Sequence, residues 1–259
     1  MGFKVVIPAR YASARLPAKP LLDLGGRPMI QWVIDAACRS AADEVLVATD
    51  DERIAAAAVD PRSPARSLAA MTRADHLSGT DRIAEVAQTR GWDGRTIVVN
   101  VQGDEPQLPP ELIDQVASLL ERHTDADIAT LCTPITSVHE FLDPNVVKVV
   151  TGRGSVALYF SRAPIPWHRD GAAHGLVSQT SILGAQRHLG IYAYRVDALR
   201  TLTAMPPSDL EVTEKLEQLR ALQAGMRLVV GIAAVPPPVG VDTDADVARV
   251  RALLVARSA

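Results

Sequence analysis

Short apolar runs alternate with amphipathic helical patterns through the first half of the chain, and this order constrains the fold more than any other feature. The apolar runs, typical of strands covered on both faces, occupy residues 4–8, 44–50 and 96–101. The helical patterns occupy residues 28–40, 52–59, 79–91 and 110–123. Connections of the strand–helix–strand type are right-handed crossovers between parallel strands. The order therefore predicts an α/β fold built on a mostly parallel, doubly wound sheet.

The middle of the chain breaks this alternation. Between residues 134 and 195, prolines and glycines separate short strand-like pieces at 146–151, 155–160 and 190–195. We interpret residues 134–195 as a β-rich subdomain inserted into a single compact domain. The parts before and after it are residues 1–133 and 196–259.

Helical character returns at residues 208–225. Ser208 and Glu211 have the spacing of a capping box, and Gly225 is a natural stop for the helix. By the same kind of signal, Thr80 is a candidate N-cap for the third predicted helix. The remaining predicted elements are a strand at residues 227–235 and a closing helix at 244–258.

Composition argues against several classes of protein. Aromatic residues make up 4% of the 259 residues and the formal net charge is −3, so neither a base-stacking surface nor a general polyanion binder is expected. No apolar run approaches the roughly 18 residues of a membrane span, and no signal-peptide pattern occurs. Cys38 and Cys132 have no neighbouring ligand set, which is typical of buried thiols in a reducing compartment. We therefore expect a cytoplasmic protein that binds no nucleic acid and does not insert into membranes.

The loop after the first predicted strand is strongly cationic. It carries Arg10, Arg15 and Lys19, and residues 1–27 hold five cations against the single anion Asp23. Ligands of a parallel α/β sheet bind at the carboxyl ends of the strands, so this loop is a candidate site. Arginine grips phosphate oxygens in a bidentate manner and lysine adds a point charge, which fits a triphosphate. Taken alone, the loop favours the alternative of a solvated basic surface.

Prolines rather than glycines shape this loop. Pro8, Pro17 and Pro20 stiffen it, and neither phosphate-binding glycine pattern, G-x-G-x-x-G or G-x-x-x-x-G-K-[ST], occurs in the chain. Side chains must therefore supply the positive charge. The missing pattern also disfavours a nicotinamide-dependent dehydrogenase.

Acidic residues follow two other strand-like segments. Asp104 comes directly after the buried run at 96–101, and Asp242 follows the late strand. A carboxylate beside bound phosphates is unfavourable unless a cation lies between them, and Mg²⁺ bridges one or two carboxylates and phosphate oxygens. Each aspartate could instead be a loop residue or a helix cap, and the sequence alone does not bring residues 104 and 242 together.

Seven motifs in order connect these features with a known family. They are IPARYASARLPAKPL, MTRADHLSGTDRIAEV, VNVQGDEP, YFSRAPIPW, RHLGIYAYR, EKLEQLRAL and GVDT. With these motifs the chain closely resembles the 3-deoxy-manno-octulosonate cytidylyltransferases, or CMP-Kdo synthetases, from about residue 4 to residue 254. The resemblance implies a Rossmann-like nucleotidyltransferase fold and a homodimer. It also implies transfer of CMP from CTP to 3-deoxy-manno-octulosonate (Kdo) with Mg²⁺, which gives CMP-Kdo for lipopolysaccharide biosynthesis and pyrophosphate.

The resemblance also implies a role for each matched residue. The triphosphate would be held by the basic loop, at Pro8, Ala9, Arg10, Arg15 and Lys19, and the cytidine read by Arg73, Ser78, Gly79 and Thr80. The metal would be carried by Asp104 and Asp242, which with Arg10, Arg15 and Lys19 form the catalytic set. The insertion would contribute to sugar binding and to dimer contacts, and the sugar pocket would be lined by Gln102, Arg162, His188, Tyr192, Glu217 and Gln218.

The chemistry of the substrates fits these roles. Kdo is a polyhydroxylated acid, so its carboxylate needs a cation such as Arg162 or His188, and its hydroxyls need amides and carboxylates. The anomeric hydroxyl attacks the α-phosphorus in line, and positioning with charge neutralisation supplies the rate. No residue stands out as a general base, so we expect Mg²⁺ to lower the pKa of the attacking hydroxyl. Without their motifs, His188 would be interpreted as a structural histidine with satisfied hydrogen bonds and Tyr192 as a half-buried strand aromatic. Glu217 and Gln218 would be interpreted as solvated helix surface.

Two further readings of the chain remain in competition. A cytidylyltransferase for another acidic sugar, such as the 8-amino relative of Kdo or a sialic acid, would differ only in a few pocket side chains. A non-catalytic nucleotide sensor on the same scaffold is disfavoured by Lys19, Asp104 and Asp242, because a sensor need not keep metal ligands. One stretch also departs from the family pattern. Residues 52–71 contain Pro61 and Pro64 and end in only a weak strand signal.

Overall fold

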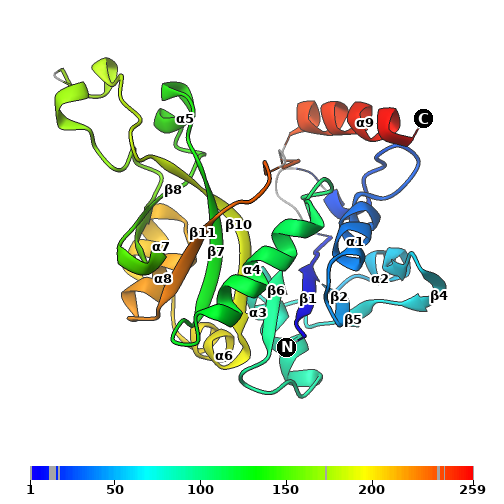
Figure 1. Cartoon of the computed structure of the whole chain (residues 1–259). Coiled ribbons are helices and arrows are strands. Elements are labelled where there is room, and N and C mark those ends of the chain that lie inside the picture. Colours follow the sequence, from blue (N-terminus) through cyan, green and yellow to red (C-terminus); the bar gives the residue numbers. More distant parts are fainter. Residues whose placement is uncertain are drawn as a thin grey trace.

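A sheet of nine strands organises the computed structural model, which describes residues 2–11, 16, 18–172, 174–237, 240–241 and 243–258 (Figure 1). Its main path runs in the order β11 (Leu228–Ile232), β7 (Ile128–Pro134), β10 (Gln186–Arg195), β6 (Ile97–Asn100), β1 (Lys4–Pro8), β2 (Glu44–Thr49) and β5 (Ala69–Met71). Strand β8 (Lys148–Thr151) pairs with β10 and with β9 (Ala157–Ser161). Neighbours on the main path are parallel except at β10, which is antiparallel to both β6 and β7. The predicted mostly parallel α/β sheet is confirmed.

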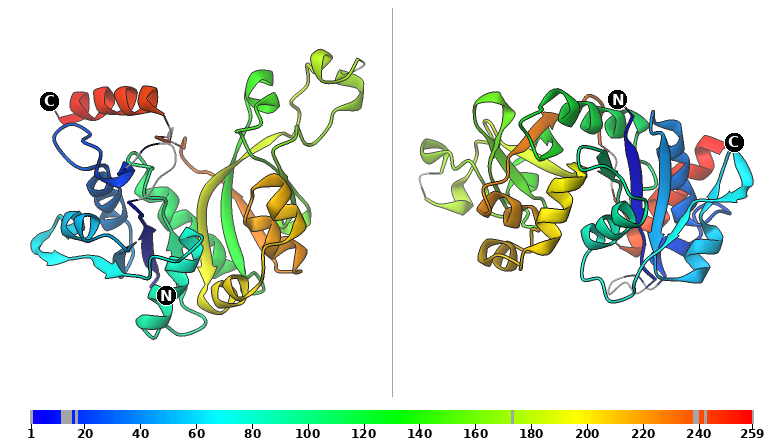
Figure 2. Two further views of the ribbon diagram at one scale, coloured as in Figure 1. Left: turned by 180° about the vertical axis from the view of Figure 1, so that it is seen from behind. Right: turned by 90° about the horizontal axis from the view of Figure 1, so that it is seen from below.

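Helices cover both faces of the sheet, as the apolar first strand requires. Val5 and Ile7 of β1 pack in one core with α1 (Met29–Arg39) and α4 (Pro110–Arg122). Val6 points the other way, into a core with α3 (Gly79–Thr89), α6 (Val196–Ala204) and α8 (Gln218–Gln223). Side chains alternate between the faces of a strand, so a run that is apolar at every position must be covered twice. Figure 2 shows these two helical layers from two further directions.

The segment that departs from the family pattern forms a small hairpin beside the edge strand. Helix α2 (Glu52–Ala57) is followed by β3 (Val59–Asp60) and β4 (Ser63–Ser67), which pair with each other. Asp60 is buried and forms ion pairs with Arg62 at 3.0 Å and with Arg66 at 3.5 Å. The weak strand signal corresponds to β5, which pairs in parallel with β2.

The N-cap of helix α3 lies two residues before the expected one. Ser78, not Thr80, is the N-cap: its hydroxyl accepts from the backbone N–H of Asp81, and the Asp81 carboxylate accepts from the Ser78 N–H in return. This capping box satisfies free donors at both ends of the first turn. The prediction of Thr80 as the cap was wrong, and its hydroxyl is free to bind elsewhere.

The helix expected at residues 208–225 is two helices. The predicted capping box between Ser208 and Glu211 is present at the start of α7 (Asp209–Glu214). Lys215 then adopts a left-handed conformation, with φ at 56°, and the chain turns before α8 begins at Gln218. The turn buries Leu216 and brings Glu217 to the hydroxyl of Thr80 at 2.5 Å. Helical periodicity does not show a break of this kind, because tertiary contacts fix it.

Most of the predicted insertion is continuous with the main sheet. Strand β10, which contains the strand-like piece at 190–195, lies between β6 and β7 in the middle of the sheet. Beyond β7, α5 (Val138–Leu142) and the loop between β9 and β10 project from one end of the molecule (Figure 1). The division of the chain at residues 133 and 195 stays a prediction.

The last helix, α9 (Asp244–Ser258), lies beside α1 and far from the projecting segment (Figures 1 and 2). Its Val250 and Leu254 pack with Leu24, Met29 and Val241 in a small separate core. Within the described residues, no helix is both long enough and apolar enough to cross a membrane.

Candidate functional site

The loop after β1 supplies the cationic side of the site. Pro8 ends the strand, and the Ala9 N–H donates to the carbonyl of Ala48 at 2.9 Å, which extends the pairing by one residue. Lys19 is the first residue of a short 3₁₀ turn. Its side chain points to Asp104, and its Nζ lies 2.7 Å from Oδ2 of that residue. Arg10 is exposed. Arg15 lies outside the described residues.

The loop after β6 passes close to the end of β1. A Cβ atom at Gly103 would lie only 3.0 Å from the carbonyl oxygen of Pro8, so a larger residue would push the two loops apart. Asp104 follows, and its carbonyl accepts from the N–H of Val241 at 3.2 Å. Asp242 itself lies outside the described residues. Val241, which precedes it in the chain, is the residue that forms this hydrogen bond with Asp104.

The N-terminus of α3 closes the third side. A Cβ atom at Gly79 would lie 3.1 Å from Cγ of Pro8, so this helix end also depends on a close approach. The three segments enclose a cavity of about 270 Å³ at the carboxyl edge of the parallel strands. Its lining residues are Pro8, Ala9, Arg10, Lys19, Pro20, His76, Leu77, Ser78, Gly79, Arg82, Gln102, Gly103 and Asp104. We call it the basic cavity.

Cationic side chains outnumber carboxylates among the described lining residues of the basic cavity. Arg10, Lys19 and Arg82 contribute cations, against the single carboxylate of Asp104 among the described lining residues. Arg82 is 3% exposed and fixed by Asp50 at 2.8 Å and by the hydroxyl of Thr72 at 2.7 Å. A concave surface with this charge binds anions such as phosphates. The sequence did not single out Arg82, although this residue lies within the motif MTRADHLSGTDRIAEV at residues 71–86.

A much smaller cavity, of about 90 Å³, lies next to the basic cavity. Gly79 and Gln102 line both, and Thr80, Asn100, Tyr192, Tyr194, Glu217 and Gln218 contribute further lining. Burial raises the pKa of Glu217, although the hydrogen bond from Thr80 opposes this. Burial and the nearby Glu217 raise the pKa of Tyr194 as well. Oε1 of Glu217 and Oδ1 of Asn100 are both buried without a hydrogen-bond partner, although the former lies 3.8 Å from the guanidinium of Arg220.

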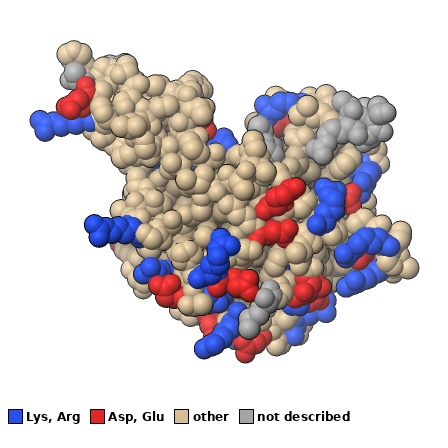
Figure 3. Space-filling view, viewed as in Figure 1, with Lys and Arg blue, Asp and Glu red and all other residues tan. Residues whose placement is uncertain are grey.

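A third and larger cavity, of about 700 Å³, opens beyond it. Its polar lining residues are Gln102, Glu105, Asp143, Asn145, Arg187, His188, Tyr192, Glu217, Gln218 and Asp246. Gln102 lines all three cavities, so they lie next to one another. We call the third one the acceptor cavity, because carboxylates and amides predominate. Figure 3 shows a hollow between the projecting segment and the part that carries α9.

His188 and Tyr192 lie on β10, with their rings 5.3 Å apart. The ring of Phe160 meets His188 edge-on at 4.9 Å. Burial lowers the pKa of His188 from its ordinary value of 6.5 to about 3, and burial raises that of Tyr192. Both rings are therefore uncharged at neutral pH. The expectation that His188 serves as a cation for a carboxylate does not fit this environment.

Arg162 is not among the described residues that line the three cavities. Its Nε donates to the carbonyl of Glu214 at 2.7 Å and one terminal nitrogen donates to the carbonyl of Pro144 at 2.9 Å. Arg187 is instead the only lysine or arginine among the described residues of the acceptor cavity. It forms an ion pair with Glu140 at 3.1 Å. Sequence reasoning missed Arg187, although it directly precedes His188 in the quoted motif.

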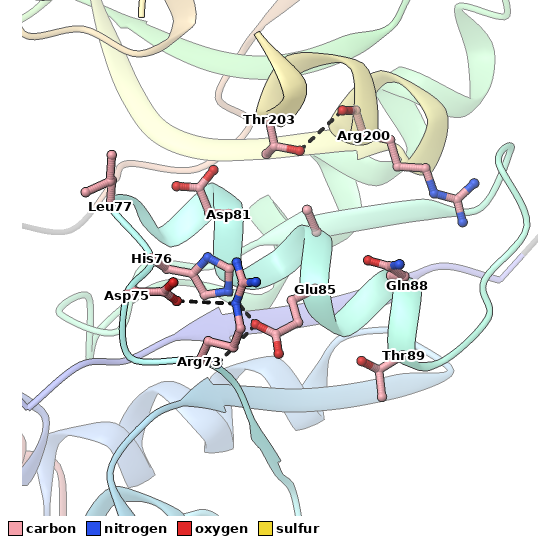
Figure 4. A pocket seen from close by; sticks show the side chains of 11 residues that line it. Arg73, Asp75, His76, Leu77, Asp81, Glu85, Gln88, Thr89, Arg200 and Thr203 are labelled. Atoms are coloured by element: carbon pink, nitrogen blue, oxygen red, sulfur yellow. Dashed lines mark hydrogen bonds and ion pairs between the residues drawn. The ribbon is translucent and has the colours of Figure 1, made fainter. Parts of the chain in front are cut away.

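Arg73 lines a different groove, between α3 and α6 (Figure 4). Its guanidinium forms an ion pair with Asp75 at 3.3 Å, and its backbone N–H donates to Glu85 at 3.1 Å. His76 contacts the same Glu85 and lines both this groove and the basic cavity. The structure thus places most of the predicted residues in three neighbouring cavities and leaves Arg73 and Arg162 outside them. The residues in the cavities are Pro8, Ala9, Arg10, Lys19, Ser78, Gly79, Thr80, Gln102, Asp104, His188, Tyr192, Glu217 and Gln218.

Asp104 is the described residue best suited to hold a divalent cation. Its side chain is 40% exposed at the junction between the basic cavity and the Val241 segment. Carboxylate oxygen is the ligand that Mg²⁺ prefers, and Mg²⁺ commonly takes only one or two protein carboxylates beside phosphate oxygens. The described residues form no cluster of three or more histidine, cysteine, aspartate or glutamate ligands. The donor set therefore fits a metal shared with a phosphate ligand rather than one enclosed by protein.

Comparison with known proteins decides the family. The cytidylyltransferase family profile matches residues 4–228. The chain is 56% identical over 254 residues to a 3-deoxy-manno-octulosonate cytidylyltransferase of Thioalkalivibrio sulfidiphilus, covering 98% of this chain and 99% of that protein. The chain belongs to this family. Another member, from Pseudomonas fluorescens, is 52% identical over 255 residues, with 98% and 99% of the two chains covered.

Solved structures agree with this membership in the cytidylyltransferases. A CMP:2-keto-3-deoxy-manno-octonic acid synthetase in complex with CTP is 40% identical and superposes with a TM-score of 0.86, covering 99% of this chain and 100% of that one. A 4-diphosphocytidyl-2C-methyl-D-erythritol synthase, at 15% identity and a TM-score of 0.61, shares the fold; 98% of this chain and 100% of that one are covered. The nucleotidyltransferase fold predicted from the sequence is confirmed.

Proposed function

We propose that this cytidylyltransferase transfers CMP from CTP to the anomeric hydroxyl of Kdo and releases pyrophosphate. The observation that carries the proposal is the set of neighbouring cavities that share Gln102, with cations lining the first and acceptors predominating in the last. A nucleoside triphosphate and a polyhydroxylated sugar acid need these two environments side by side. High identity to chains named for this activity supports the same assignment.

The basic cavity is assigned to the nucleotide. Arg10 and Lys19, with Arg15 from the same loop, would bind the triphosphate against the backbone of Pro8 and Ala9. Ser78, Gly79 and Thr80 at the start of α3 would bind the cytidine end, since free N–H groups at a helix N-terminus favour polar and anionic ligands. Arg73 would join them only through movement of its loop, because it faces the neighbouring groove.

The acceptor cavity is assigned to the sugar. Gln102, Tyr192, Glu217 and Gln218 would bind its hydroxyls, for which side-chain oxygens and amides are suitable partners. Arg187 is assigned to the carboxylate, because a guanidinium binds a carboxylate strongly and it lines this cavity. Arg162 would act indirectly, through its hydrogen bond to the carbonyl of Pro144, because Pro144 precedes Asn145, which lines the acceptor cavity.

Asp104 and Asp242 are assigned to Mg²⁺. When bound, the metal neutralises phosphate charge and acidifies a nearby hydroxyl. Lys19, whose Nζ lies 2.7 Å from Oδ2 of Asp104, orients this carboxylate. The chain itself contributes positioning: Lys19 and Arg10 would hold the phosphates, and Gln102 lines both the cavity assigned to the nucleotide and the cavity assigned to the sugar.

We further propose a homodimer and a cytosolic location. Large apolar side chains are exposed on β9, at Leu158 (63%), and on the loop between β9 and β10, at Trp167 (44%), Leu176 (55%) and Leu183 (78%). Exposed apolar side chains on a projecting loop and the strand that leads into it are suited to a protein contact. Sedimentation of the chain at micromolar concentration tests the dimer, and a monomer would contradict it. The two cysteines are free and buried, which is compatible with a reducing compartment.

The function is tested by following pyrophosphate release from CTP and Mg²⁺ in the presence of Kdo, 8-amino-Kdo or a sialic acid. We expect release with Kdo. Preferential release with another of these sugars would instead assign the chain to that acceptor. Binding of CTP without release in any mixture would overturn catalysis in favour of nucleotide sensing.

A further inference from the structure

A threonine hydroxyl contacts the Nε2 atom of the His188 ring. Thr130 is fully buried in β7, and its Oγ1 lies 2.9 Å from Nε2 of His188. The same oxygen lies 2.8 Å from the carbonyl oxygen of Ile191 and 3.2 Å from that of Leu189. The pairing of β7 with β10 shifts register between Leu189 and Tyr192, and this bulge is where the two carbonyls meet the hydroxyl.

Thr130 has a single hydroxyl proton, and this determines which partner donates in each of its hydrogen bonds. A carbonyl oxygen only accepts, so the single hydroxyl proton of Thr130 must point to Ile191, with Leu189 sharing it at longer range. The contact with His188 is then satisfied only if Nε2 carries a proton and donates it to Oγ1. A neutral imidazole has one protonated nitrogen, so Nδ1 is left with a lone pair.

Nδ1 is the nitrogen available to a ligand. His188 lines the acceptor cavity, and no described residue forms a hydrogen bond with its Nδ1. The edge of Phe160, 4.9 Å away, and the ring of Tyr192, 5.3 Å away, hold the imidazole plane between them. The ring therefore cannot turn over without losing the Thr130 contact and its packing.

We propose that Thr130 is a positioning residue: it fixes His188 in the tautomer with the proton on Nε2, so that Nδ1 accepts a hydrogen bond from a sugar hydroxyl. The proposal rests on the proposed function and gives His188 a role different from that of a cation. An unprotonated ring nitrogen repels a carboxylate but accepts a hydrogen bond from a hydroxyl. Recognition of the acid group is thereby left to Arg187, and His188 reads the polyol part of the sugar.

The protonation of the ring supports this division. Burial lowers the pKa of His188 to about 3, so the imidazole stays neutral throughout the range in which an enzyme of this kind would be assayed. The charged groups that line the same cavity are Glu105, Asp143, Arg187, Glu217 and Asp246. Four of the five are carboxylates, whose oxygens accept hydrogen bonds from hydroxyl groups. A hydroxyl-bearing ligand is the partner that this set accommodates.

The tautomer can be measured on the free protein by ¹⁵N NMR of labelled histidine. The chain has six histidines, and the signal of His188 is identified by its loss in H188N. We expect a neutral ring with its proton on Nε2. In T130V, which keeps the shape but removes the hydroxyl, we expect this tautomer to lose its preference, and T130S should restore it. A proton on Nδ1 in the unchanged chain, or the same tautomer in T130V, would overturn the positioning role.

Kinetics then tests the consequence for the sugar. Loss of one oriented hydrogen bond predicts a KM for Kdo about tenfold higher in T130V, with the KM for CTP little changed and T130S restoring most of the loss. Thermal unfolding of both variants shows whether they fold. An equal rise in both KM values would reduce Thr130 to a structural residue. Absence of turnover in the unchanged chain would overturn the proposed function, whereas the tautomer measurement stands independently of turnover.

Two substitutions of His188 separate its nitrogens. In H188N the amide oxygen can take the place of Nδ1, while in H188Q the amide nitrogen takes the place of Nε2 and bonds Thr130. Because the ligand needs the acceptor, we expect the KM for Kdo to rise less in H188N than in H188Q. The reverse order would contradict acceptance through Nδ1.

Discussion

The N–H of Val241 donates a hydrogen bond to the carbonyl of Asp104 at 3.2 Å, across 137 residues of chain. This bond joins the loop after β6 to the segment that leads into α9. The same loop reaches Lys19 through the Asp104 carboxylate at 2.7 Å. Three distant parts of the sequence thus meet at one aspartate, beside a cavity that carries positive charge.

Asp104→Asn removes the carboxylate charge but keeps the shape of the side chain. We expect turnover at saturating CTP and Kdo to fall by at least about a hundredfold, because even outer-shell partners of metal ligands contribute 10- to 100-fold. Pyrophosphate release at increasing Mg²⁺ measures this. Asp125→Asn is a matched control, since Asp125 is an exposed residue that pairs only at the surface with Arg227. Turnover of Asp104→Asn within a few fold of the unchanged chain would remove Asp104 from the metal site.

Arg187→Gln and Arg162→Gln together decide which arginine binds the sugar carboxylate. Arg187 lines the acceptor cavity, while Arg162 is bonded to the carbonyls of Glu214 and Pro144. A charge-assisted hydrogen bond is worth about 1.5–3 kcal/mol, so Arg187→Gln should raise the KM for Kdo by about tenfold to a hundredfold. We expect a smaller change in Arg162→Gln. Steady-state kinetics with saturating CTP measures both values, and the opposite order would assign the carboxylate to Arg162.

Thr80→Val tests the contact between the start of α3 and the sugar side. Thr80 donates to Oε2 of Glu217 at 2.5 Å, and without it a half-buried carboxylate loses a donor. Leaving a fully buried acceptor unpaired costs about 1–3 kcal/mol, so the free energy of unfolding should fall by up to about this amount. Urea unfolding of Thr80→Val and of Thr80→Ser, which keeps the hydroxyl, makes the comparison. Equal stability of the two variants would show that the contact contributes nothing.

Acid should destabilise the protein partly through His188. In the unfolded chain this histidine takes up a proton near pH 6.5, but in the folded chain its pKa is lowered to about 3. Between these values the unfolded state binds more protons, so the free energy of unfolding falls as the pH falls, by at most about 1.4 kcal/mol per pH unit from this group. H188N lacks this contribution.

Urea unfolding at pH 7 and pH 5 measures the effect as a difference between the two proteins. The other titrating groups are common to both and cancel. The unchanged chain should lose more stability than H188N over this interval. Equal losses would mean that His188 titrates near its ordinary pKa in the folded protein.

Local sequence signals predicted the framework of the fold well. The continuously apolar run of β1 indicated a strand covered on both faces, and Val5 and Val6 do pack in opposite cores. The capping box between Ser208 and Glu211 is present where it was expected. These features depend on residues close together in the chain. They are therefore visible in its periodicity and spacing.

Features that depend on distant contacts were not predictable in the same way. The central position of β10 is set by its pairing with β6 and β7, and the turn at Lys215 by burial of Leu216 and the bond of Glu217 to Thr80. The same limit applies to Arg187 and Arg162. Both are arginines in quoted motifs, and only the three-dimensional arrangement distinguishes the one that lines the cavity.

The most direct test of the whole account is ³¹P NMR of a mixture of the purified chain, CTP, Kdo and Mg²⁺. We expect the three CTP signals to be replaced by one phosphodiester signal of CMP-Kdo and by pyrophosphate, in equal molar amounts. CTP signals that persist unchanged under saturating Kdo would contradict it.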